Sequence, residues 1–125
     1  MKYPYNTGQT VIALMVFMVM ASTITAAAVA LSIINSQSAS AIELGNNALS
    51  VANSGGENAM LRLLRNPSYT GETLTVGDGT ATITVTGTNP YVITSKGQVG
   101  DFSRTIQVVA TGSGFLTVSS WKETP

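Results

Sequence analysis

The sequence predicts an α+β fold, in which one long N-terminal helix packs on a small antiparallel β-sheet. Two observations predict it. Residues 3–42 carry no charge and contain the apolar run Val11–Ile34, and a helical spacing of apolar residues continues beyond this run. After Pro67 the spacing changes to an alternation of threonine with apolar residues, which is typical of half-buried strands. The chain of 125 residues has room for one folded domain.

The composition excludes several kinds of functional site. Six Lys and Arg balance six Asp and Glu, and charged residues make up only 10% of the chain. A neutral chain with few cations is poorly suited to bind a phosphate backbone, so we do not expect nucleic acid as a partner. The lack of Cys and His in the sequence removes thiolate and imidazole metal sites and nucleophiles activated by histidine. We therefore expect no enzymatic activity, no cofactor and no metal.

The apolar run predicts a single membrane-spanning helix. At about 1.5 Å per residue, a helix over Val11–Ile34 is about 36 Å long, and the hydrocarbon core of a bilayer is about 30 Å thick. A buried helix of a soluble protein is less favoured, because the rest of the chain is too short to surround it. A cleaved signal peptide has a shorter apolar run with small residues behind it. Lys2 and the initiator amine flank the run, which predicts a cytoplasmic N-terminus and an external remainder.

Beyond the apolar run, small and apolar residues continue the helix as an amphipathic stripe. Its members follow one another at steps of three and four: Ile42, Gly45, Leu49, Ala52, Gly56, Met60 and Leu63. Gly55 and Gly56 lower the stability of a helix interior and allow a bend there. Asn66-Pro67 ends the helix, since proline disfavours helical geometry in the residue before it. We expect one long helix, apolar over 9–35 and amphipathic over 36–66.

Residues 67–125 predict an antiparallel sheet domain. The expected strands are 73–76, 80–86, 91–94, 104–111 and 114–120. The sequence Gly77-Asp78-Gly79 is a strong hairpin signal, and Gly97 and Gly100 are expected in connecting loops. So small a meander cannot close a core alone. We therefore expect the amphipathic stripe to cover one face, with Ile42, Leu49, Met60 and Leu63 docked on the sheet.

Few side chains of this domain are candidates for chemistry. A pair of its carboxylates could serve acid–base chemistry or bind calcium, but those of the glycine-rich loops are explained as turn residues. These carboxylates are Glu72, Asp78, Asp101 and Glu123. Scattered cations with two tyrosines could form a weak patch for single-stranded DNA; they are Arg62, Arg65, Lys96 and Arg104 with Tyr69 and Tyr91. Phe115 and Trp121 are interpreted as core or edge cover.

The N-terminus resembles that of the type IV pilin superfamily, which includes pilins, minor pilins and pseudopilins. The residues that carry the resemblance are the short leader MKYPYNTG (residues 1–8), with Gly8 at its end, and Gln9-Thr10-Val11-Ile12, which open the apolar helix. The stretches 41–64 and 95–108 are similar to the small-residue helix and the penultimate hairpin of such subunits. The resemblance implies cleavage after Gly8 by a prepilin peptidase and methylation of Gln9. It also implies a filament core formed with other pilin subunits through Val11, Ile12, Ala13, Leu14 and Phe17.

One position departs from the pattern of the family. Most pilins carry a glutamate five residues after the cleavage site, where this chain has Ala13. In the family that carboxylate is thought to pair with the N-terminal amine of a neighbouring subunit. A buried, unpaired charge in lipid is costly and needs a cation, so Ala13 removes both the cost and the docking group. We therefore expect a minor subunit, similar to minor pilins that lack this glutamate.

The expected function is that of a structural subunit of a type IV pilus-like filament or pseudopilus at the cell surface. Before assembly the chain would lie as a single-pass protein in the inner or cytoplasmic membrane. Two alternatives stay open. One is a membrane-anchored extracellular binding module, similar to an adhesin, which would keep residues 1–8. The other is a pseudopilin for DNA uptake, whose exposed cations would touch DNA.

Overall fold

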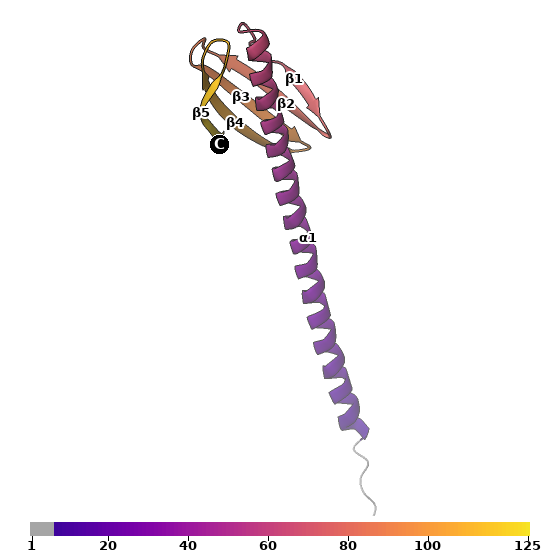
Figure 1. The fold of residues 1–125 in the computed structure, drawn as a ribbon. Coiled ribbons are helices and arrows are strands. Elements are labelled where there is room, and N and C mark those ends of the chain that lie inside the picture. Colours follow the sequence, from indigo (N-terminus) through magenta and orange to yellow (C-terminus); the bar gives the residue numbers. More distant parts are fainter. Residues whose placement is uncertain (1–6) are drawn as a thin grey trace, which may run out of the picture. The chain divides into compact units, whose positions relative to one another are not determined.

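The computed structural model describes residues 7–125, and the first six residues of the leader lie outside this range (Figure 1). The elements in chain order are α1 (Thr7–Arg65), β1 (Thr73–Val76), β2 (Gly79–Thr86), β3 (Tyr91–Val99), β4 (Phe102–Thr111) and β5 (Thr117–Thr124). The chain divides into two compact units, Met1–Ser40 and Ala41–Pro125. The α+β prediction is confirmed, because one long helix packs, through its second half, on a five-stranded antiparallel sheet.

Helix α1 is one α-helix of 59 residues that ends at Arg65, without an interruption at Gly55 and Gly56. The glycine pair therefore does not break the helix. A Cβ on Gly55 would lie 2.9 Å from the Ala81 Cβ, and one on Gly56 would lie 2.9 Å from the Ile106 Cδ1. Both glycines are buried where the helix meets the sheet. Their role is to let the sheet approach the helix closely, and this packing offsets their low helix propensity.

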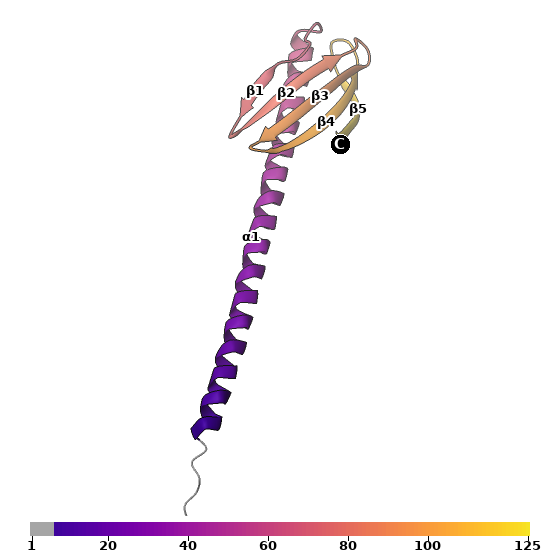
Figure 2. The ribbon, with the colours of Figure 1, turned by 180° about the vertical axis from the view of Figure 1, so that it is seen from behind.

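The sheet is a simple meander in which each strand pairs antiparallel with its neighbour in sequence, in the order β1-β2-β3-β4-β5 (Figure 2). Two Gly-Asp pairs turn the chain at the same end of the sheet. Val76 pairs with Gly79 around Gly77-Asp78, and Val99 pairs with Phe102 around Gly100-Asp101. Both turn glycines have φ of +57°, a conformation that glycine adopts without steric cost.

Several strand bounds differ from the prediction. Strand β3 continues to Val99, so Gly97 is a strand residue and its placement in a loop was wrong. Strand β4 begins at Phe102, and β5 begins at Thr117 instead of residue 114. Gly97 lies where the strand passes the helix, since a Cβ there would collide with the main chain at Ala48 and Ala52. A glycine that permits such a close approach looks like a loop residue when only the sequence is read.

The core lies between the second half of α1 and the alternate residues of β2, β3 and β4. It is formed by Ala52, Ala59, Leu63, Ile83, Val85, Tyr91, Ile93, Ile106 and Val108, with Leu49, Met60, Tyr69, Leu74 and Leu116 packed against it. Leu49, Met60 and Leu63 therefore dock as expected. Ile42 does not, because 66% of its surface is exposed. Among the stripe residues, burial begins one turn later at Gly45, against which the Arg104 guanidinium lies.

Ser95 is the polar exception in this core. It is completely buried, and within residues 7–125 its Oγ has no hydrogen-bond partner. An unsatisfied buried hydroxyl costs about 1–3 kcal/mol. We expect Ser95→Ala to raise the free energy of unfolding by about 1 kcal/mol in urea titrations followed by circular dichroism. The exposed Ser119, whose hydroxyl donates to the Val109 carbonyl at 3.1 Å, is the control, and Ser119→Ala should give no such gain. A loss of stability in Ser95→Ala would contradict this account.

Candidate membrane and filament segment

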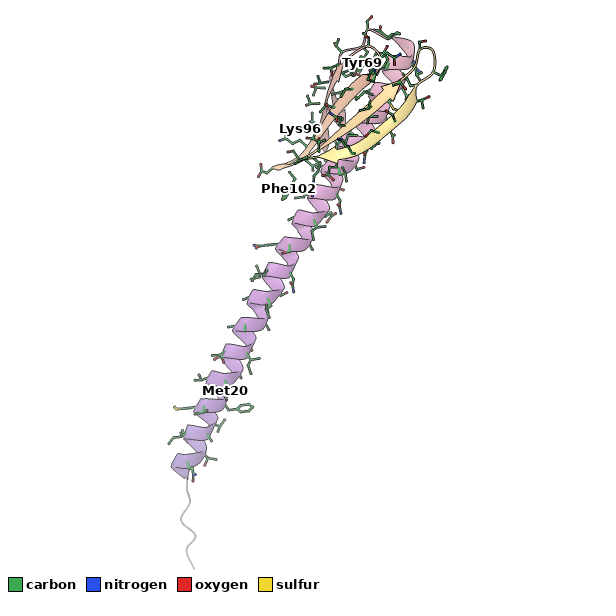
Figure 3. All side chains as sticks on the ribbon, turned by 90° about the vertical axis from the view of Figure 1, so that its left-hand side faces the viewer. Met20, Tyr69, Lys96 and Phe102 are labelled. Atoms are coloured by element: carbon green, nitrogen blue, oxygen red, sulfur yellow. The ribbon has the colours of Figure 1, made fainter. Side chains whose placement is uncertain are left out.

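The first unit presents an unbroken apolar helical surface. Every residue from Gly8 to Ser40 is exposed, including Phe17 with 72% of its surface accessible. Within the described residues, α1 is one helix near the N-terminus that is long and apolar enough to span a membrane. Figure 3 shows side chains such as Met20 directed outward along this stretch. Exposed apolar surface of this extent is costly in water, so the segment needs lipid or protein around it.

The candidate processing and filament-core residues lie in the first turns of α1. Gly8 and Gln9 are exposed, and a Cβ built on Gly8 would meet nothing within 4 Å. The five candidate core residues follow on the same helix and are exposed; they are Val11, Ile12, Ala13, Leu14 and Phe17. Ala13 and Phe17 are four residues apart and therefore share one face. The first unit by itself thus keeps all of these positions accessible to an enzyme or to a neighbouring helix.

Three hydroxyl groups within the apolar segment are satisfied by the helix itself. Ser22 donates to the Val19 carbonyl at 2.9 Å, and Thr23 donates to the Met20 carbonyl at 2.8 Å. Thr25 donates to the Ala21 carbonyl at 2.8 Å. These bonds remove the need for water around the hydroxyls, so these residues are compatible with an apolar environment.

Small residues form an open groove along one face of this segment. Ser22, Ala26 and Ala30 recur at steps of four, and Thr25, Val29 and Ile33 complete the lining. Small side chains at this spacing let a second helix approach closely, which is how helices associate in the absence of a hydrophobic driving force. The groove is therefore suited to helix–helix packing in a bilayer or in a helical bundle.

In the second unit, two of the four candidate carboxylates are held in ion pairs. The Arg62 Nε lies 3.0 Å from the Glu72 Oε1, which also accepts a hydrogen bond of 3.0 Å from the Tyr69 hydroxyl. The Arg104 Nη1 lies 2.8 Å from the Glu123 Oε1. The first pair links the end of α1 to the segment before β1, the second links β4 to β5, and both are partly exposed. Their role is to fasten the ends of the sheet domain, and their contribution to stability is small.

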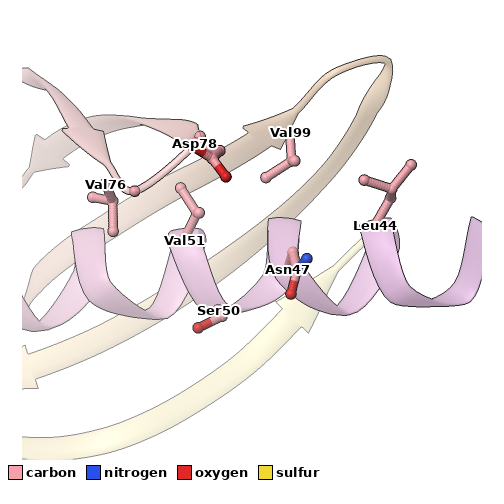
Figure 4. A pocket seen from close by; sticks show the side chains of 9 residues that line it. Leu44, Asn47, Ser50, Val51, Val76, Asp78 and Val99 are labelled. Atoms are coloured by element: carbon pink, nitrogen blue, oxygen red, sulfur yellow. The ribbon is translucent and has the colours of Figure 1, made fainter. Parts of the chain in front are cut away.

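The other two carboxylates, Asp78 and Asp101, are the turn residues that the sequence predicts. Asp78 also borders a cleft of about 430 Å³ between α1 and the β1–β2 turn (Figure 4). The cleft is otherwise lined by Leu44, Asn47, Ser50, Val51, Val76, Gly77, Gly79 and Val99. Among these described residues Asp78 alone is charged, and it has no second group beside it for acid–base chemistry. Within residues 7–125, no three acidic, histidine or cysteine side chains meet to hold a metal.

The cation patch considered for single-stranded DNA is not assembled. Arg62 and Arg104 are paired with carboxylates, and Tyr91 is buried with 8% of its surface exposed. Trp121 covers the edge of the helix–sheet contact, because its Nε1 donates to the Asn53 Oδ1 at 3.0 Å. Phe115 is neither core nor cover, since 71% of its surface is exposed on the loop before β5.

The Tyr69–Glu72 contact makes the stability of the second unit sensitive to alkaline pH. Burial, the hydrogen bond to Glu72 and the negative charge of that carboxylate raise the pKa of Tyr69 from 10.0 to about 12, although Arg62 lowers it. Above pH 10 the unfolded phenol loses its proton while the folded one keeps it. The free energy of unfolding should therefore fall as the pH rises from 10 to about 12. This fall should be smaller in Tyr69→Phe, as measured by urea titration. Equal slopes in both proteins would contradict the assignment.

Comparison with protein-family models, with curated proteins and with solved structures finds no match to this chain. The evidence for its function therefore comes from the residues and their geometry.

One surface is not predicted by the sequence alone, namely the outer face of the sheet, where threonines from several strands gather. The alternation Thr80, Thr82, Thr84 and Thr86 is its signal in the sequence, but the register of all five strands is needed to assemble the face.

Proposed function

We propose that this chain is a structural, non-enzymatic subunit of a type IV pilus-like filament or pseudopilus. The observation that carries the proposal is that α1 combines two segments of different character in one helix. Its first half is exposed and free of charged residues, and its second half packs on the sheet. The resemblance of residues 1–12 to the leader and helix start of pilins supports the same function.

The proposed mechanism is physical. The apolar half of α1 is stored in the membrane with its N-terminus in the cytoplasm, and a prepilin peptidase removes residues 1–8. Assembly then moves the helix from lipid into a bundle with other subunits. Lipid tails and neighbouring helices are similarly apolar, so close helix packing through the groove of Ser22, Ala26 and Ala30 takes the place of packing against lipid. The second unit lies outside the membrane and forms the surface of the filament.

The absence of a carboxylate at position 13 supports a minor role. A new N-terminal ammonium entering an apolar bundle needs a charge-assisted partner. Ala13 offers none, so the chain would join a bundle built by other subunits more readily than it would build one alone.

The decisive experiment is the mass of the mature protein isolated from membranes and from sheared filaments. A chain that begins at Gln9 and occurs in the filament fraction would support the proposal. A chain that keeps residues 1–8 and stays in the membrane fraction would contradict it and favour an anchored binding module. If the mature chain occurs in filaments and substitution of its cations abolishes DNA uptake, the result would favour the pseudopilin alternative.

The minor role gives a quantitative prediction. The wild-type chain should be scarce in sheared filaments relative to its co-subunits, and it should not form filaments when it is expressed alone. Ala13→Glu should increase its share several-fold, because it restores a partner for an incoming ammonium. Quantitative mass spectrometry of the filaments measures this share, and Ala13→Gln is the uncharged control. Finding the wild-type chain as the dominant subunit would overturn the minor role.

A further inference from the structure

The outer face of the sheet, on the side away from α1, is rich in threonines. In β2 the residues with even numbers are exposed while their neighbours are buried against the helix. The register aligns these positions in rows across the strands. One row is Thr73, Thr82, Lys96, Thr105 and Thr124; the next rows are Thr75, Thr80, Gln98 and Ser103 on one side and Thr84, Thr94, Gln107 and Lys122 on the other. Figure 2 looks onto this face.

Most hydroxyls of this face are accessible to a ligand. Within residues 7–125, one threonine of the three rows, Thr124, donates to the Thr105 carbonyl over 3.5 Å, and Thr86, in the row beside them, donates to the Val92 carbonyl over 3.5 Å. The other threonines of the three rows, all within the described residues, make no such bond. Each threonine offers a donor and an acceptor, and the two glutamines add amide groups. The three rows therefore present a broad, regularly spaced set of hydrogen-bonding groups.

The charges on this face have one sign. Lys96 and Lys122 are exposed there, and Figure 3 labels Lys96 on the sheet. Lys96 lies on β3 and Lys122 on β5, with β4 between them. Two inter-strand spacings and one step of two residues along the strand separate the two lysines by about 12 Å. The six Asp and Glu carboxylates of the chain all lie elsewhere: Glu43 and Glu57 on α1, Glu72 ahead of β1, Asp78 and Asp101 in turns, and Glu123 on the side of β5 that pairs with Arg104. The face therefore complements a sparsely charged anionic partner.

We propose that this outer sheet face binds an acidic polysaccharide. Such a polymer carries carboxylates at intervals and hydroxyls along its whole length, which match two separated lysines among threonines and glutamines. A nucleic acid fits less well, because the three rows, as described, hold no aromatic side chain for base stacking and few cations. A protein partner fits less well too, since binding hot spots are large aromatic or arginine side chains. The proposal does not depend on whether the chain assembles into a filament.

The test uses the full chain in nanodiscs of zwitterionic phosphatidylcholine, with alginate as the immobilised acidic polysaccharide. Binding is expected to alginate and not to the neutral polymer dextran, and it should weaken as salt is added. Lys96→Gln and Lys122→Gln should each weaken binding about fivefold, the size expected for one exposed ion pair. Thr105→Val removes a hydroxyl on β4, the strand between the two lysines, while keeping the shape and strand preference of the side chain, and it should also weaken binding.

Arg65→Gln is the matched control, because it removes one exposed cation from the end of α1 and leaves the face intact. It should bind alginate like the wild type. Equal losses in Arg65→Gln and in the lysine variants would overturn the proposal, since binding would then follow net charge alone. No binding to alginate, or equal binding to dextran, would also overturn it. Tighter binding to a thymidine oligonucleotide than to alginate would replace the polysaccharide with nucleic acid. Circular dichroism of each variant verifies that the sheet is folded.

Discussion

Gly97→Ala is expected to destabilise the second unit by about 3 kcal/mol. Gly97 lies in β3 directly against the helix. A Cβ at this position would collide with the Ala48 carbonyl oxygen and the Ala52 nitrogen, and it would lie 3.0 Å from the Ala52 Cα. All of these atoms are helix backbone and cannot rotate away. The helix would have to move off the sheet, which would open the core around Ile93 and Val108.

Chemical denaturation of the full chain, followed by circular dichroism, measures this destabilisation. Gly45→Ala is the matched control, because it adds the same methyl group to a glycine at the helix–sheet contact. Its Cβ would lie 3.6 Å from the flexible Arg104 side chain, which is ordinary contact. Alanine is a better helix former than glycine, so this variant should gain about 1 kcal/mol. If Gly97→Ala unfolds at the same denaturant concentration as the wild type, the close approach of β3 to α1 is not as described.

Gly8→Val is expected to abolish maturation and to leave a full-length membrane protein. The resemblance to prepilins implies that the peptidase leaves no room for a side chain at this position. The structure removes the competing explanation of a folding defect, since Gly8 is exposed and its Cβ would meet nothing within 4 Å. The mass of the N-terminal peptide, and the absence of the chain from sheared filaments, measure the effect.

Ala28→Val is the control, because it adds a branched side chain at an exposed position further along the same helix. This variant should be processed like the wild type. Normal processing of Gly8→Val would count against a pilin-like leader, while the α+β fold would be unaffected.

The sequence predicts the type and order of the elements well, because periodicity reports which face of each element is buried. The change from helical spacing to alternation at Pro67 locates the junction between helix and sheet, and the Gly-Asp pairs locate two turns. Periodicity fails where glycine replaces a side chain to permit close packing. Gly55 and Gly97 look like breaks in the sequence, and they become contact points only once the partner element is known.

The candidate site could be predicted only in part. The exposed apolar half of α1 follows directly from its composition, and the positions of Gly8 to Phe17 follow from their place on one helix. Ile42 was wrongly placed in the core, because the extent of the sheet along the helix is not encoded locally. The threonine face depends on the register of five strands, which combines residues from Thr73 to Thr124 and cannot be read from any one strand.

The meander order of the sheet also has a consequence for folding kinetics. Each strand pairs with its neighbour in sequence, so hairpin formation needs only short loops to close, and the entropy lost in each closure is small. Sheets whose contacts are local in sequence fold faster than those that need distant strands to meet. Hairpins can therefore form one after another from β1 to β5. No early step has to wait for the C-terminal residues.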